Sequence, residues 1–272
     1  MIPENFVLQW KEKAPWQSLS MVEHDLVISR ALVDLYQNET ISNALVFRGG
    51  TALNKLYINP PARYSEDIDL VQLKSAPIGP VIDAIRDALF PWFGEPKRIR
   101  TERSIKLIYR YKTFEQEPTK LKIEINTTEH FQVNKLRAFP FEARSDWFEG
   151  SANIITYDLE ELMATKLKAL YQRRKGRDLF DWWYVLSKQL INVSTTIPIF
   201  QAYCRHEGEE VTRALFEKSL AFKRDHQDFR LDMRPLLPPS VEWDFDRAYN
   251  LVLADVISLI PGEAWKGLRQ PA

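Results

Sequence analysis

The spacing of hydrophobic residues changes from helical to strand-like within the first fifty positions of the chain. Between Leu19 and Tyr36 apolar side chains recur every three or four residues, which predicts an amphipathic helix. The anchors of that pattern are Met21, Leu26, Ile28, Leu32 and Leu35. The next apolar run, Ala44 to Phe47, is short and uninterrupted. It predicts a buried strand that stops at Gly49-Gly50.

Elements of both kinds follow up to Tyr157. Pro60-Pro61 predicts a loop, because proline cannot continue a helix or a sheet ladder. We expect helices over Thr51–Tyr57 and Pro80–Phe90, strands over Asp67–Val71, Lys97–Arg103, Lys106–Lys112 and Lys120–Asn126, and a further β-rich stretch up to Tyr157.

Beyond Tyr157 the pattern is helical and stays mostly so to Ile260. Asp158 is a suitable N-cap for a helix that runs to Gln172, with Glu160 and Glu161 in its first turn. The chain therefore predicts an α+β half with a mixed sheet, residues 1–157, and a helical half, residues 158–272.

Composition narrows the class of protein. The 272 residues are 45% hydrophobic and 27% charged, as in soluble globular proteins, and no apolar run is long enough to span a membrane. A single cysteine, Cys204, excludes a disulfide framework and fits a reducing compartment. The charged N-terminal segment does not have the pattern of a signal peptide. We expect a cytoplasmic protein without a membrane association.

Asp67-Ile68-Asp69 is the first candidate for chemistry. Side chains alternate along a strand, so both carboxylates share one face, with Cα atoms roughly 6.5–7 Å apart. Such a pair can bind Mg²⁺, which neutralises phosphate charge in phosphoryl transfer. Short D-x-D patterns also occur on ordinary solvated strands.

Gly49-Gly50-Thr51 strengthens the first interpretation. The three residues lie between a predicted strand and a predicted helix, where backbone N–H groups can bind phosphate oxygens. Glycine allows the close approach, and the Thr51 hydroxyl can bind or cap. A simple strand-to-helix turn explains the same residues. Neither the P-loop nor the Rossmann signature is present.

Glu124 is a possible third carboxylate. In the segment Leu121–Asn126 it shares a strand face with Lys122 and Asn126, whereas the apolar residues point the other way. It could orient or deprotonate an acceptor hydroxyl. An exposed glutamate on an amphipathic strand is the alternative.

Two groups in the helical half complete the candidates. Lys166 lies within the apolar stripe of the helix 158–172, where an ammonium needs an anion or a route to solvent, whereas Lys168 lies on the opposite face. Asp178 and Asp181 are three residues apart and share one face of the next helix. They can form a polar cluster with Lys166, or they can simply complement a helix dipole.

Four segments together resemble the AbiEii/AbiGii toxin family of nucleotidyltransferases. The segments are Phe47-Arg48-Gly49-Gly50-Thr51-Ala52-Leu53, Arg63-Tyr64-Ser65-Glu66-Asp67-Ile68-Asp69-Leu70, Leu162–Leu170 and Arg174–Asp181. Their order and placement match the four motifs of that family over roughly residues 45–184.

The resemblance implies a polymerase-β-like nucleotidyltransferase fold followed by a helical domain that completes the active-site cleft. It implies that Gly49, Gly50 and Thr51 hold the phosphates of a nucleoside triphosphate and that Asp67 and Asp69 bind Mg²⁺. Lys166, together with Asp178 or Asp181, would be needed for activity. Members of the family include toxins of type IV toxin–antitoxin and phage-defence systems, with a cognate antitoxin as partner, and some similar enzymes add nucleotides to the 3′ end of tRNA.

The nature of the acceptor is left open by the residues alone. Two basic stretches favour RNA: 97–112 has seven Lys or Arg against one Glu, and 166–177 has six against none. Transfer to a small molecule or to a protein hydroxyl is a second possibility. A nucleotide-binding regulator without turnover is a third, although the retained Asp67 and Asp69 argue against it.

Overall fold

The computed structural model describes residues 2–267, which form two compact units. The first comprises residues up to His130, Lys135–Tyr157 and Leu237–Pro239, and the second comprises Phe131–Asn134, Asp158–Leu236 and the residues from Ser240 onward. Within the described part of the chain, no helix is both long and apolar enough to cross a membrane.

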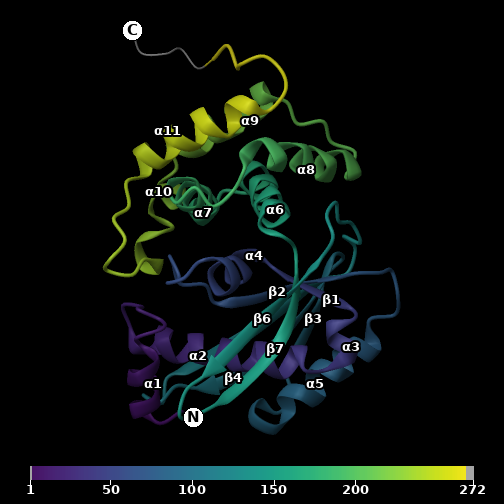
Figure 1. Cartoon of the computed structure of the whole chain (residues 1–272), viewed down its shortest axis with the longest axis vertical. Coiled ribbons are helices and arrows are strands. Elements are labelled where there is room, and N and C mark those ends of the chain that lie inside the picture. Colours follow the sequence, from purple (N-terminus) through teal and green to yellow (C-terminus); the bar gives the residue numbers. More distant parts are fainter. Residues whose placement is uncertain (1, 268–272) are drawn as a thin grey trace. The chain divides into compact units, whose positions relative to one another are not determined.

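The first unit contains a seven-stranded mixed sheet of order β3-β4-β5-β2-β1-β7-β6 (Figure 1). Its strands are β1 (Leu45–Arg48), β2 (Asp67–Gln72), β3 (Lys97–Arg100), β4 (Ser104–Lys112), β5 (Pro118–Asn126), β6 (Arg137–Arg144) and β7 (Glu149–Thr156). Its helices are α1 (Glu4–Trp10), α2 (Leu19–Tyr36), α3 (Glu39–Ser42), α4 (Gly49–Ala52), the π-helix η1 (Leu53–Tyr57) and α5 (Gly79–Phe93).

One face of the sheet is apolar and is covered by helices. Ile68 and Leu70 of β2 are buried, as are the alternate residues of β4 and β5 opposite them in register. Tyr111 on that face contacts His24 of α2 and Phe93 of α5. Because side chains alternate, Asp67, Asp69 and Glu124 must lie on the other face.

The second unit is built of helices around α6 (Leu159–Gln172). The others are α7 (Gly176–Ser187), α8 (Val193–His206), α9 (Arg213–Arg224), α10 (Gln227–Leu231), η2 (Arg234–Leu236), α11 (Phe245–Asp255) and η3 (Ile257–Leu259). Asp158 caps α6 as expected, since its Oδ1 accepts the backbone N–H of Glu161 at 2.8 Å.

The environment of α6 differs from the expectation of a one-sided stripe. This helix contacts α7, α8 and α9, so it is buried on more than one side. Lys168, which we expected on the solvent side, is only 7% exposed. Its ammonium lies 2.7 Å from Oε1 of Glu207 and over the ring of Tyr203. A sequence stripe identifies the most apolar face of a helix but does not show how many neighbours pack around it.

The α+β fold with a mixed sheet is confirmed, and most of the expected elements are present. The predicted helix from Leu19 to Tyr36 coincides with α2. The strand expected over Lys97–Arg103 ends earlier, at Arg100. There Thr101 forms a turn whose N–H donates to the carbonyl oxygen of Ser104, and β4 begins.

Candidate active site

Asp67, Asp69 and Glu124 form a cluster on the polar face of the sheet, called here the carboxylate cluster. β2 and β5 are parallel neighbours, and Asp69 lies directly opposite Glu124 in register, while Asp67 lies opposite Lys122. Arg48 of β1 is the partner of Asp69 on its other side, and Lys106 of β4 is the partner of Glu124. Asp69 and Glu124 are therefore adjacent in the sheet, with Arg48 next to Asp69 and Lys106 next to Glu124.

Lysines neutralise part of this cluster. Nζ of Lys122 lies 2.7 Å from Oδ2 of Asp67 and 3.5 Å from Oε2 of Glu124. Glu124 also accepts the Ser104 hydroxyl at 3.0 Å and lies 3.3 Å from Nζ of Lys106. Burial opposes ionisation of Glu124, but these hydrogen bonds and charges lower its pKa overall. Glu124 is therefore a carboxylate held in its ionised form.

Asp69 is the member of the carboxylate cluster whose ionised form is disfavoured. Burial raises the pKa of its carboxyl, and the charge of Asp67 raises it further, while Arg48 and Lys122 act in the opposite direction. A carboxylate whose charge is poorly compensated in the resting protein is suited to receive a cation.

The absence of a side chain at Gly49 lets the carboxylate of Asp69 lie close to the backbone. β1 ends at Arg48 and α4 begins at Gly49, which has a φ of +83°. A Cβ atom at this position would lie 2.5 Å from Oδ2 of Asp69. The glycine is required both by its left-handed backbone and by the approach of the aspartate. The neighbouring Gly50 is packed against the buried guanidinium of Arg63.

Thr51 contributes to the framework of the site. Its hydroxyl contacts the carbonyl oxygen of Asp67 and the hydroxyl of Ser65. Since the carbonyl can only accept, Thr51 donates to it, and the Thr51 hydroxyl oxygen lies 2.8 Å from that of Ser65. The side chain is buried, so the hydroxyl ties α4 to the start of β2.

Two polar residues that we did not single out from the sequence support the same loop. Asn54 accepts the backbone N–H groups of Ala62 and Arg63 and donates to the carbonyl of Gly50. His24 is buried and lies 2.9 Å from the carbonyl oxygen of Glu66, with Tyr111 on its other ring nitrogen. A polar residue in an apolar helical stripe was the available signal for His24.

The donor set of the carboxylate cluster is suited to Mg²⁺. Within residues 2–267 no three Asp, Glu, His or Cys side chains form a ready-made metal site. Magnesium does not need one, because it is commonly held by one or two carboxylates together with substrate phosphates and water. Asp67 and Asp69 supply hard oxygen donors on one strand face, and the partial compensation of Asp69 leaves charge for a cation.

Lys166, Asp178 and Asp181 form a buried ionic group in the second unit. Nζ of Lys166 lies 2.5 Å from Oδ2 of Asp181 and 4.0 Å from Oδ1 of Asp178, and all three side chains are at most 5% exposed. Of the two interpretations that the sequence left open for these aspartates, the structure shows the polar cluster with Lys166. Charges this well buried persist only when paired.

Arg173, at the C-cap of α6, is paired with an aspartate of α7. Its guanidinium makes a bidentate pair with Asp178, at 2.7 and 2.9 Å. Lys223 of α9, which the sequence analysis missed, donates to the carbonyl oxygens of Leu170 and Tyr171. Burial lowers the pKa of Lys223 to about 8. The end of α6 is thus fixed by two cations.

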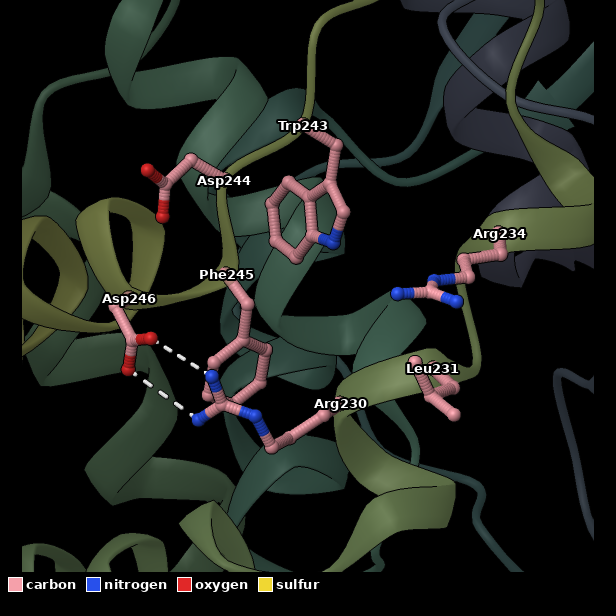
Figure 2. A pocket seen from close by; sticks show the side chains of 7 residues that line it. All are labelled: Arg230, Leu231, Arg234, Trp243, Asp244, Phe245 and Asp246. Atoms are coloured by element: carbon pink, nitrogen blue, oxygen red, sulfur yellow. Dashed lines mark hydrogen bonds and ion pairs between the residues drawn. The ribbon is translucent and has the colours of Figure 1, made fainter.

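A separate pocket of about 320 Å³ lies in the second unit between α10 and the start of α11 (Figure 2). Arg230 lies over the ring of Phe245 and makes two contacts with Asp246, the closer at 2.7 Å. Trp243 and Arg234 line the opposite side. None of the predicted site residues takes part in this pocket.

Comparison with known proteins identifies the family and the fold. The family of nucleotidyl transferase AbiEii toxins of type IV toxin–antitoxin systems matches residues 30–251. MenT4, a nucleotidyltransferase toxin from Mycobacterium tuberculosis H37Rv, has a TM-score of 0.67 at 16% identity, over 96% of this chain and 91% of that one. JHP933 from Helicobacter pylori has a TM-score of 0.55 at 17% identity, over 87% of this chain and 90% of that one.

A search of curated protein sequences gives no match. At these identities the two solved structures establish the fold, while the family match spans most of the chain and includes all four segments singled out from the sequence. The chain therefore belongs to the AbiEii family, the nucleotidyltransferase toxins of type IV toxin–antitoxin systems.

Proposed function

We propose that this nucleotidyltransferase uses Mg²⁺ to transfer a nucleoside monophosphate from a nucleoside triphosphate to RNA, at the 3′ end of tRNA. The observation that carries the proposal is the register of β2 and β5, which sets Asp69 directly beside Glu124 with Asp67 on the same face. Three carboxylates on one sheet face beside a glycine turn are suited to a metal-bound triphosphate and a hydroxyl acceptor.

Each residue of the first unit has a distinct part in this proposal. Asp67 and Asp69 would hold Mg²⁺, which supplies charge neutralisation on the phosphates when bound. Gly49 and Gly50 admit the triphosphate to the backbone N–H groups at the start of α4. Thr51 holds that turn against β2. The lowered pKa of Glu124 favours orienting the acceptor hydroxyl through a hydrogen bond over carrying its proton.

Lys166 would stabilise negative charge on the triphosphate. Asp181, whose carboxylate contacts the Lys166 ammonium directly, would hold it in place, whereas Asp178 is bound by Arg173. Of the two aspartates, Asp181 is therefore our candidate for the motif residue. That residues 158–272 act as a helical domain completing the cleft of residues 1–157 is also part of the proposal.

The biological role follows from the family. A type IV toxin implies an antitoxin partner, and we propose that modification of tRNA in the cytoplasm, where triphosphates and RNA are abundant, arrests growth during phage infection. Transfer to a small molecule or protein hydroxyl is the alternative, because a fold alone does not select the acceptor.

A labelling assay separates these functions. The full chain is incubated with Mg²⁺, each labelled nucleoside triphosphate in turn, and total bacterial RNA with the soluble protein fraction. Label in tRNA that is lost after removal of its 3′ terminal nucleotides supports the proposal. Label in protein or in small molecules, with none in RNA, supports the alternative. Asp67→Asn serves as the inactive control.

A further inference from the structure

The basic stretch from Lys97 to Lys112 is divided between the two faces of the sheet. Lys106 lies opposite Glu124 in the β4–β5 register, so Lys106, Arg110 and Lys112 share the face of the carboxylate cluster. Arg98 and Arg100 of β3 lie opposite Leu107 and Ile105, whose side chains belong to the apolar face. Two of the seven cations of the stretch are therefore directed away from the cluster.

β5 adds a further cation to the carboxylate face. Lys120 is the direct cross-strand partner of Arg110, and both side chains are exposed. Like charges directly opposite each other destabilise a sheet. Within residues 2–267 neither Arg110, Lys112 nor Lys120 has a carboxylate within ion-pair distance, whereas Lys106 and Lys122 are paired with the cluster. Arg110, Lys112 and Lys120 therefore carry positive charge that no carboxylate of the described residues neutralises.

We propose that Arg110 and Lys120, with Lys112 beside them, bind the phosphates of a single-stranded RNA 3′ end. The three residues are called here the acceptor track. Lys120 is four residues from Glu124 along β5, a distance of about 13 Å. A strand of RNA bound on the track would present its terminal hydroxyl towards the carboxylate cluster. This inference rests on the proposed function and identifies the surface that selects the acceptor.

The surroundings of the track favour a short single strand over a duplex. Glu115 and Glu117 lie in the turn that joins β4 to β5, so the positive surface ends just beyond Lys112. Ile108 is half-buried on the same face and Ile99, opposite Lys106, is 36% exposed. They offer apolar contact to an unstacked base, which a paired strand does not expose.

The test compares two double variants that each remove two exposed cations of the sheet. Arg110→Gln with Lys120→Gln removes two of the three cations of the track, and Arg98→Gln with Arg100→Gln is the matched control on the other face. The probe is a fluorescent single-stranded RNA with a free 3′ hydroxyl, titrated across a salt series, with the same sequence as a blunt duplex for comparison. Binding of the nucleoside triphosphate is measured separately.

The track variant should bind the single strand about 10-fold more weakly, with a salt slope reduced by about 1.4 for two lost contacts. The control should bind like the wild type, and triphosphate affinity should be unchanged in both. Equal losses in the two variants, no loss in either, or equal affinity of the wild type for the duplex would overturn the track. Wild-type protein that binds RNA but labels only protein or small molecules would instead refute the proposed function. If the wild-type protein binds no RNA, both the acceptor track and the proposed function are refuted.

Discussion

Oδ2 of Asp69 lies where the side chain of residue 49 would begin, since a Cβ built on Gly49 would be 2.5 Å away. The first two family segments are thus joined by one contact between a glycine and a carboxylate. Gly49→Ala should displace Asp69 and also strain the backbone, whose φ is +83°. We expect loss of transfer and a loss of unfolding free energy of about 1–3 kcal/mol, measured by urea denaturation.

Gly94→Ala separates these two effects. Gly94 also has a positive φ, of +68°, but a Cβ there would meet no atom within 4 Å. It should lose stability through strain and retain transfer. If Gly49→Ala were as active as Gly94→Ala, the contact with Asp69 would have no role in the site.

Asp69→Asn should raise stability while removing activity. The pKa of Asp69 is raised by burial and by Asp67, so the folded protein holds this proton to higher pH than the unfolded chain does. The stabilising contribution of protonated Asp69 is lost as pH rises through that pKa, so at neutral pH a neutral amide should be better tolerated. Transfer should fall on the order of 100-fold or more.

Thermal unfolding with and without Mg²⁺ checks the same residue independently of turnover. Mg²⁺ should raise the midpoint of the wild type, because a ligand of the folded state stabilises it, and should have little effect on Asp69→Asn. A variant that is less stable than the wild type at neutral pH, or equally shifted by Mg²⁺, would contradict the assignment.

His24 should make stability fall in mild acid. Burial lowers its pKa below the ordinary value, so the unfolded state binds more protons as pH falls through about 6.5. Stability from neutral His24 is therefore present above that pH and is lost below it. Unfolding measured between about pH 5 and 8 should show this slope in the wild type and less of it in His24→Gln.

His226→Gln, at an exposed histidine, is the control and should retain the wild-type slope. Because His24 lies 2.9 Å from the carbonyl oxygen of Glu66, next to Asp67, transfer by the wild type should weaken over the same acid range. An unchanged slope in His24→Gln would assign the acid sensitivity to other groups.

Lys166 and Asp181 should be strongly coupled. Removal of one partner leaves a buried charge uncompensated, so Lys166→Met or Asp181→Leu should each cost about 3–5 kcal/mol. The double variant should recover part of that loss but no transfer. A double-mutant cycle by denaturation measures the coupling, and additive losses would show that the ion pair is unimportant.

The local elements of this protein are largely predictable from its sequence, because their signals are local. Period-2 alternation places Asp67 and Asp69 on one face, and Ser18, which accepts the N–H of Met21, begins α2 where its apolar spacing begins. The sequence also suggested the buried ionic group as one of two interpretations, since a lysine within an apolar stripe needs an anion or a route to solvent.

The relations between strands were not predictable in the same way. That Glu124 stands beside Asp69, and Lys120 opposite Arg110, depends on strand order and register, which pair residues far apart in the chain. Thr51 was interpreted as a phosphate ligand or a cap because its sequence neighbours suggested it, whereas its hydroxyl bonds to the carbonyl of Asp67 across 16 residues. Arg173 was not predicted as a partner of Asp178, because cations at helix ends are usually exposed to solvent.

The contact between Lys122 and Asp67 means that the carboxylate cluster carries its own counter-ion. Although burial works against it, the hydrogen bond to Asp67 raises the pKa of Lys122, so the ammonium is the stable form. A divalent ion arriving with its nucleotide would exchange with a tethered monovalent one, and the displaced ammonium would be left beside the incoming phosphates. Chelation would then return the protein to a resting state in which Lys122 pairs with Asp67, instead of unfolding it, in contrast to small domains that depend on a structural metal.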